Sequence, residues 1–141
     1  MAQGRVSKKE RLKIVLDSNA LFVPLQFRID IFEELKNLLN RNFELVLLSP
    51  IQRELERMAK TGTFKIAKDA SYALKLAKKC TLVEVNAHSF SSPDDTIVEM
   101  AREWNCTVFT NDRLLRKRLR NINVPVIYVR QKSHLEIDGR I

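Results

Sequence analysis

Short apolar blocks alternate along the chain with longer blocks in which apolar residues recur every three or four positions. The short blocks predict five β-strands, at Lys13–Asp17, Glu44–Leu48, Thr81–Val85, Thr107–Thr110 and Val126–Val129. Short apolar runs without alternation are typical of strands buried on both faces of a parallel sheet. We therefore expect a central, twisted parallel sheet of about five strands.

The longer blocks predict amphipathic helices between these strands. Their apolar stripes begin at Ile31, Ile51, Ile66, Ile97 and Leu115, and stripes with this spacing usually face a core. Ser49 and Ser92 each precede a proline and are expected N-caps, and Asn111 is the expected cap of the last helix. Strands alternating with helices predict an α/β fold with helices on both faces of the sheet.

The pattern fits a single domain. We expect a basic N-terminal arm at 1–11, a folded domain at 12–135 and a C-terminal tail at 136–141, with loose ends at about 1–11 and 133–141. No apolar run approaches the roughly 20 residues that span a bilayer. The first residues contain no apolar segment of the kind that secretory signals have. We expect a cytoplasmic protein without a membrane partner.

The cysteines and glycines exclude some chemistry. Cys80 and Cys106 have neither the spacing nor the histidine neighbours of a zinc site. Each precedes a predicted strand, so two free thiols are the default and a disulfide between them stays open. The glycines Gly4, Gly62 and Gly139 form no phosphate-binding loop, which excludes a dinucleotide-binding domain.

Charge suggests a polyanionic partner. The net charge is +8, and basic residues gather in the N-terminal arm and the C-terminal third. A field of this sign attracts nucleic acid, although a basic helix face that only contacts solvent is the simpler alternative. The candidate nucleic-acid-binding residues are Arg113, Arg116, Lys117, Arg120, Lys8 and Lys9.

Acidic residues follow two of the predicted strands. Asp17 comes directly after the first strand, and Asp112 follows the fourth. Ligands of open α/β sheets bind beyond the carboxyl ends of the strands, so both side chains are candidate functional groups. The structural alternatives are that Asp17 caps a turn and that Asp112 is a helix N-terminal acid.

Helical phase separates two neighbouring acids. Relative to Ile97, Asp94 falls at about +60°, within the apolar stripe, and Asp95 at about +160°, outside it. An acid on a buried helix face is costly unless it is paired or metal-bound. Asp95 therefore suits a capping role and Asp94 a functional one. Glu54 lies at the edge of its own stripe, where an ion pair with Arg53 or Arg57 is the alternative.

The four acids belong to the same edge of a parallel sheet. Each follows a strand or lies near the start of the helix after one. Four like charges in a small volume repel each other, and a divalent cation removes that conflict. Oxygen ligands without histidine or cysteine favour Mg²⁺ or Mn²⁺.

These motifs, in this order, resemble the PIN-domain ribonucleases. The resemblance rests on D-S-N after the first strand, S-P-x-x-x-E-L, D-D-x-I-x-x-x-A and T-N-D, and it extends from about Lys13 to Leu135. The segments ELERMAK, TNDRLLRKRLRN and VPVIYVRQKSHLE are most similar to the archaeal and eukaryotic branch linked to small-subunit ribosomal RNA processing.

The resemblance implies a metal-dependent ribonuclease. The family's acids would fall on Asp17, Glu54, Asp94 and Asp112, which would be both catalytic and metal-binding. Its polar helpers would fall on Ser18, Asn19, Thr110 and Asn111. Many relatives carry a further acid where this chain has Leu114. RNA would be the partner, and homodimers are common in the family.

Three other functions compete with this interpretation. A non-catalytic RNA-binding factor of ribosome assembly and the toxin of a toxin–antitoxin pair both fit the same pattern. A phosphoacceptor receiver domain needs paired acids after the first strand and a lysine after the fifth. This chain has Asp17 alone at the first place and Arg130 at the second, which argues against a receiver.

Overall fold

The computed structural model describes residues 11–86 and 92–141. The elements are β1 (Leu12–Leu16), η1 (Ser18–Phe22), α2 (Val23–Phe27), α3 (Ile31–Leu39), β2 (Phe43–Leu48), α4 (Ser49–Thr61), α5 (Phe64–Ala77), β3 (Thr81–Val83), α6 (Pro93–Glu103), β4 (Cys106–Phe109), α7 (Arg113–Asn121), β5 (Val126–Arg130) and β6 (His134–Asp138). In the part of the chain that the structure describes, no helix is long and apolar enough to cross a membrane.

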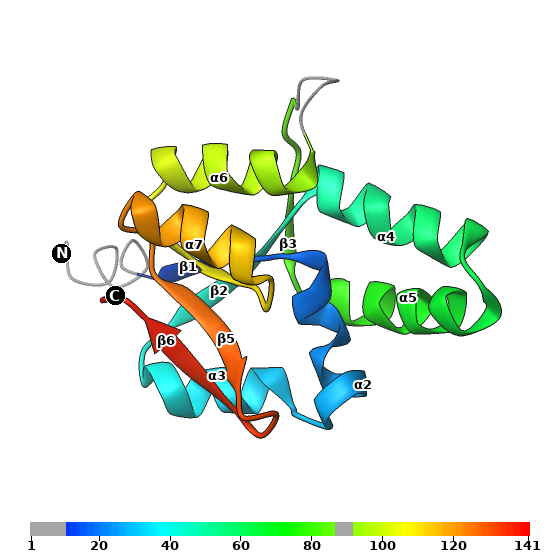
Figure 1. Cartoon of the computed structure of the whole chain (residues 1–141), viewed down its shortest axis with the longest axis horizontal. Coiled ribbons are helices and arrows are strands. Elements are labelled where there is room, and N and C mark those ends of the chain that lie inside the picture. The colour runs from blue at the N-terminus through cyan, green and yellow to red at the C-terminus, as the bar shows by residue number, and fades with distance from the viewer. Residues whose placement is uncertain (1–10, 87–91) are drawn as a thin grey trace, which may run out of the picture.

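The strands form one sheet in the order β3-β2-β1-β4-β5-β6. Strands β1 to β5 are parallel, and β6 runs antiparallel to β5. Helices α6 and α7 lie on one side of the sheet and α3 on the other (Figure 1). The predicted α/β fold, with helices on both faces of a mostly parallel sheet, is therefore confirmed.

Burial explains why the central strands could be predicted. The whole of β4 is buried, and so are four of the five residues of β1, because helices cover both faces of the sheet. Strand β1 lies between β2 and β4. After β1 the chain adds β2 and β3 next to one edge of β1, and then returns to add β4, β5 and β6 next to its other edge. The carboxyl ends of β1 and β4 thus flank the topological switch point where open α/β sheets bind ligands.

The C-terminal end differs from the sequence prediction. Residues 134–138 form β6, which pairs with β5 from Val126 to Arg130. The prediction of a loose end at 133–141 is therefore wrong for this segment, and the predicted boundary at 135 falls inside a strand. The N-terminal arm lies almost entirely outside the described residues, apart from Arg11.

Two helix caps also differ from the prediction. Ser49 is the first residue of α4 rather than its N-cap, and its hydroxyl oxygen accepts a hydrogen bond of 3.0 Å from the backbone N–H of Val85. The N-cap of α7 is Asp112, not Asn111. At α6 the prediction is confirmed, because Ser92 and Asp95 form a reciprocal capping box.

The two cysteines are free thiols. Cys80 precedes β3 and Cys106 lies in β4, and strands β2 and β1 separate β3 from β4. Adjacent strands are about 4.8 Å apart, so the two sulfur atoms are too distant for a disulfide. Burial raises the pKa of each thiol to about 11.

Candidate active site

Asp17 lies at the centre of the candidate site. It follows β1 directly, and its backbone N–H donates to the carbonyl oxygen of Phe109 at the end of β4 at 3.0 Å. This hydrogen bond continues the β1–β4 pairing by one residue and carries Asp17 to the switch point. The residue is only 4% exposed, so its carboxylate is largely withdrawn from water.

Neighbouring polar groups orient this carboxylate. The backbone N–H of Ser18 donates to Oδ1 at 2.8 Å, and Oδ2 accepts from the Asn19 amide at 3.0 Å and from the Thr110 hydroxyl at 2.7 Å. The side-chain oxygen of Asn19 accepts in turn from the backbone N–H of Asn111 at 3.0 Å. The four residues predicted as polar helpers therefore all contact Asp17 or a partner of Asp17, with Ser18 acting through its backbone.

Two other predicted acids act electrostatically on Asp17. The pKa of Asp17 is raised from 3.8 to about 6. Burial is the largest cause, and the negative charges of Asp94 and Glu54 act in the same direction, against the lowering effect of the hydrogen bonds from Thr110 and Ser18. Charges act in this way only at short range in a protein. The fold thus brings the acid of α4 and the acid of α6 towards the end of β1.

Asp94 and Asp95 have different surroundings in the structure, as helical phase predicts. Burial raises the pKa of Asp94, and the charge of Asp112 raises it further. Asp95 instead completes the capping box and forms an ion pair of 2.9 Å with Arg118 of α7. That ion pair ties α6 to α7, and Asp94 remains the candidate site acid of α6.

Asp112 caps helix α7, and its charge also acts on Asp94. Its Oδ1 accepts hydrogen bonds from the backbone N–H groups of Leu114 and Leu115 at 2.8 and 3.2 Å, so it caps α7. Its own backbone N–H donates to the Thr110 hydroxyl oxygen at 3.1 Å. The capping alternative is thus correct for one carboxylate oxygen, while the charge of Asp112 still acts on Asp94.

Comparison with known proteins gives this site a family. Residues 14–132 match the PIN like domain family, and all four predicted acids lie within the match. The chain belongs to the PIN-like domain family. Asp17 follows β1, Glu54 lies on α4 after β2, Asp94 lies on α6 after β3, and Asp112 lies between β4 and α7. Each acid thus follows a strand of the same parallel sheet.

Three proteins are similar to this chain over most of its length. Ribonuclease VapC4 of Methanocaldococcus jannaschii is 39% identical over 132 residues, which cover 92% of this chain and 98% of the relative. The PIN domain endonuclease Utp24 is 26% identical, with 92% of each chain covered and a TM-score of 0.74. VapBC2 of Rickettsia felis, solved with a DNA fragment from its promoter, is 16% identical, with a TM-score of 0.62, 84% of this chain and 100% of the other covered, and shares the fold.

The donor chemistry of the PIN-like site fits a hard divalent cation. The four groups are carboxylates, and within residues 11–86 and 92–141 none of them forms an ion pair with a lysine, arginine or histidine. In the same residues, no group of three or more acidic, histidine or cysteine side chains is arranged to hold a metal ion. The charges of Asp94 and Glu54 act on Asp17, and that of Asp112 acts on Asp94, so the acids repel one another. They would have to move closer together to share one ion.

Four of the basic residues predicted to bind nucleic acid lie on α7, the helix that Asp112 caps. Arg113, Arg116, Lys117 and Arg120 of α7 line one hollow of about 440 Å³ together with Asp138. Arg116 and Arg120 both pair with Asp138, at 2.9 and 3.2 Å, which reduces their net charge. Lys8 and Lys9 lie outside the described residues.

Sequence reasoning missed the side chains of β6. His134, Glu136 and Asp138 alternate with Leu135 and Ile137, and this period of two predicts a strand with one polar face. Glu136 contacts Tyr128, Arg130 and His134, and Asp138 holds the two arginines of α7. The signal is present in the sequence, but the predicted domain boundary at 135 divides this segment and leaves its second half in the tail.

Proposed function

We propose that this protein is a metal-dependent ribonuclease that hydrolyses RNA phosphodiester bonds. Asp17, Asp94, Asp112 and Glu54 would bind Mg²⁺ or Mn²⁺. The observation that carries the proposal is the buried carboxylate of Asp17, whose pKa is raised by burial and by two further acids. Mutual repulsion among clustered acids is costly for folding, and a bound divalent cation offsets that cost.

The chain's own residues would prepare the site for this chemistry. Ser18, Asn19 and Thr110 donate hydrogen bonds that fix the Asp17 carboxylate and favour its ionised form. When bound, a divalent cation would stabilise the negative charge that develops on the phosphate oxygens during hydrolysis. The basic residues of α7 would bind the RNA backbone, and we propose the cytoplasm as the place of action.

A cleavage assay tests this proposal directly. A 5′-labelled single-stranded RNA is incubated with the protein and Mn²⁺, with and without EDTA. Asp17→Asn should lower the cleavage rate by about 100-fold or more, because it removes a proposed ligand. Asp69→Asn is the matched control, since Asp69 lies on α5 in an ion pair with Lys65. Cleavage that resists both EDTA and Asp17→Asn would overturn the proposal.

The finer proposal is a role in ribosomal RNA processing. It is supported by the sequence motifs of the small-subunit branch and by the likeness to the endonuclease Utp24 over almost the whole chain. We expect depletion of the protein in its own organism to cause an unprocessed small-subunit ribosomal RNA precursor to accumulate. Normal precursor levels after depletion would contradict this role.

The second candidate is a toxin that is silenced by an antitoxin partner. The similarity to a protein named VapC4 favours it. Such a toxin should arrest growth when it is expressed alone, and a small protein encoded beside it should restore growth. Growth that is unaffected by expression, together with the precursor phenotype, would decide for ribosomal RNA processing.

The third candidate is an RNA-binding assembly factor without catalysis. The spacing of the acids, which forms no ready three-ligand group in the described residues, is the observation that favours it. If the protein is such a factor, the wild type and Asp17→Asn should bind RNA equally well, and neither should cleave it. Metal-dependent cleavage by the wild type alone would exclude it.

A further inference from the structure

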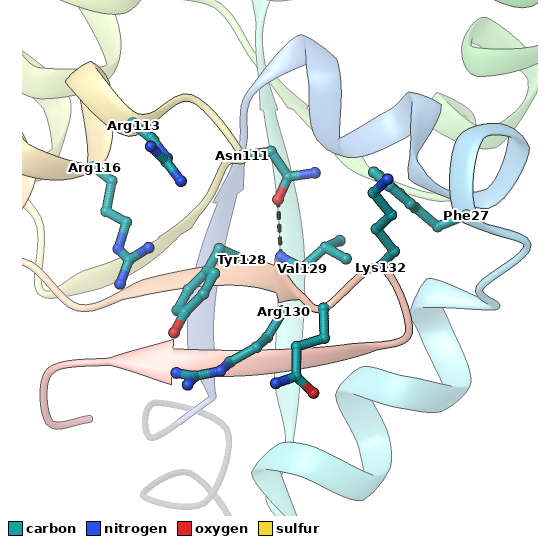
Figure 2. Close-up of a pocket in the computed structure, with 9 residues that line it drawn as sticks. Phe27, Asn111, Arg113, Arg116, Tyr128, Val129, Arg130 and Lys132 are labelled. Atoms are coloured by element: carbon teal, nitrogen blue, oxygen red, sulfur yellow. Dashed lines mark hydrogen bonds between the residues drawn. The ribbon is translucent and has the colours of Figure 1, made fainter.

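A second cavity adjoins the candidate active site. Its volume is about 600 Å³, which is in the range of sites for small ligands. Figure 2 shows Arg113 and Arg116 of α7 on one side of it and Phe27 and Lys132 on the other. Tyr128 of β5 lines the cavity between them.

Hydrogen bonds link this cavity to the carboxylates. The side-chain oxygen of Asn111, which lines the cavity, accepts from the backbone N–H of Val129 at 2.8 Å (Figure 2). The backbone N–H of Asn111 donates to Asn19, whose amide donates to Asp17. Asn111 therefore lies between the lining of the cavity and the residues that hold the Asp17 carboxylate.

Two cations of the cavity are available to a ligand. Within the part of the chain that the structure describes, Arg113 and Lys132 form no ion pair, and both are exposed. Arg130, by contrast, lies 3.4 Å from Glu136. Arg113 and Lys132 lie on opposite sides of the cavity (Figure 2), which suits an anion that repeats along a chain.

Tyr128 and Arg116 form a fixed aromatic and cationic pair. The guanidinium carbon of Arg116 lies 3.7 Å from the centre of the Tyr128 ring. Asp138 holds Arg116 from one side, and the Tyr128 hydroxyl donates to Glu136 at 3.4 Å. Unpaired RNA bases stack on aromatic rings and on guanidinium planes, so this pair offers a surface for a base.

The turn between β5 and β6 has a backbone conformation that its residue types disfavour. It is closed by a hydrogen bond of 3.1 Å from the Ser133 N–H to the Arg130 carbonyl. Both central residues have positive φ angles, 53° at Gln131 and 59° at Lys132. Asparagine and glycine are strongly preferred in such turns. Here both strained residues line the cavity, which favours a function for their side chains over optimal folding.

We propose that this cavity binds one nucleotide of the RNA strand whose neighbouring phosphodiester lies at the carboxylates. Arg113 and Lys132 bind phosphate groups, and the base stacks on the Arg116–Tyr128 pair. This inference rests on the proposed ribonuclease function and adds a subsite to it. An acidic peptide would use the two cations but has no base for the stacking surface, so RNA fits better.

The test measures RNA binding rather than cleavage. The probes are 5′-fluorescein-labelled ten-nucleotide strands of uridine or adenosine, titrated with protein in the Asp17→Asn background and followed by fluorescence anisotropy. Tyr128→Leu should weaken binding at least about five-fold. Lys132→Gln should weaken it about five-fold at low salt and reduce the salt dependence, the slope of log K against log[salt], by about 0.7. Tyr72→Leu and Lys68→Gln, both on α5, are the matched controls and should bind as the background does.

Two further measurements separate a direct contact from structural damage. Lys132→Gly should raise the melting temperature, because glycine suits the positive φ angle, while it weakens RNA binding as Lys132→Gln does. In a second measurement, a series of probes carries one abasic nucleotide at successive positions along the strand. At one position the missing base should weaken binding as much as Tyr128→Leu does. With that probe, Tyr128→Leu should cause no further loss of affinity. A loss of both stability and affinity in Lys132→Gly would overturn the proposal.

The outcomes also distinguish this inference from the proposed function. Wild-type protein that cleaves RNA with Mn²⁺, combined with cavity variants that bind RNA normally, would refute the subsite alone. RNA binding that depends on Tyr128 and Lys132, without cleavage by the wild type, would support the subsite and refute the ribonuclease. A fluorescein-labelled deca-glutamate peptide serves as the competing ligand. If it binds as tightly as RNA, and if the same variants lose this binding, the assignment to RNA would be overturned.

Discussion

The Thr110 hydroxyl donates a hydrogen bond of 2.7 Å to the Asp17 carboxylate, although 93 residues separate the two in the chain. The same hydroxyl oxygen accepts from the backbone N–H of Asp112. One side chain thus joins the carboxyl ends of β1 and β4 and places two of the four acids. It also favours the charged form of Asp17, which burial disfavours.

Removing this hydroxyl should make Asp17 harder to ionise. A hydrogen bond to a charged group contributes about 1.5–3 kcal/mol, so Thr110→Val should raise the pKa of Asp17 by about one unit or more. We expect the acid limb of the pH–rate profile for RNA cleavage to move upward by that amount. Thr110→Ser, which keeps the hydroxyl group, should leave the profile near that of the wild type. Equal profiles for the valine and serine variants would contradict this role.

Asp17 should make the stability of the metal-free protein depend on pH. Its folded pKa of about 6 lies above the unfolded value of 3.8, so between these values the folded state binds more protons. Stability from this group is therefore present below pH 4 and lost as the pH rises through 6, by at most about 3 kcal/mol.

Urea unfolding of the wild type and Asp17→Asn at pH 4 and pH 7.5 in EDTA measures this effect. The asparagine side chain of the variant does not ionise, so only the wild type loses this stability as the pH rises. The free energy of unfolding of Asp17→Asn, relative to that of the wild type, should therefore increase by up to about 3 kcal/mol from pH 4 to pH 7.5. Asp69→Asn serves as the comparison and should show no such gain. The same difference between wild type and Asp17→Asn at both pH values would count against the raised pKa.

Thr107 in β4 offers a stability test outside the site. Its hydroxyl group is buried and, within the described residues, has no hydrogen-bond partner. Thr107→Val should raise the free energy of unfolding by about 1 kcal/mol, because it removes an unsatisfied polar atom at nearly constant volume. Thr96→Val is the contrasting variant, since the Thr96 hydroxyl donates to the Ser92 carbonyl. It should lower stability by about 1 kcal/mol, and the same sign in both variants would refute the argument.

Strand β6 should be part of the folded domain rather than a tail. Deleting residues 136–141 removes Ile137, which packs against the core, and Asp138, which pairs with Arg116 and Arg120. We expect a loss of about 2 kcal/mol or more in the free energy of unfolding, since burying one isoleucine contributes about that much. Thermal unfolding of the shortened chain measures it. An unchanged melting temperature would restore the boundary at 135 that the sequence suggested.

The central strands could be predicted because burial on both faces leaves a simple signal. The five apolar blocks coincide with β1 to β5 to within two residues at each end. The short helices η1 and α2, over residues 18–27, have no stripe of their own and were not predicted. Strand β6 differs from these helices, because its residues alternate as in an edge strand and only two of them, Leu135 and Ile137, are apolar. Five residues of this kind at the end of the chain are a weak signal beside the continuous apolar blocks.

The candidate site shows where local pattern stops being informative. Helical phase separated Asp94 from Asp95 because both lie on one helix, and the structure gives them the expected different surroundings. The hydrogen bond between Asp17 and Thr110 depends on the register of β1 against β4, which is set by the whole sheet. The pairing of Arg116 with Asp138 likewise needs the position of β6, so no local pattern could predict it.

A crystal structure of the protein soaked in Mn²⁺, with anomalous data, tests the central claim most directly. We expect an anomalous peak bound by Asp17 and Asp94, with Asp112 and Glu54 drawn towards it, and no such peak in Asp17→Asn crystals. The account would be contradicted if Mn²⁺ left the carboxylates apart and gave no peak between them.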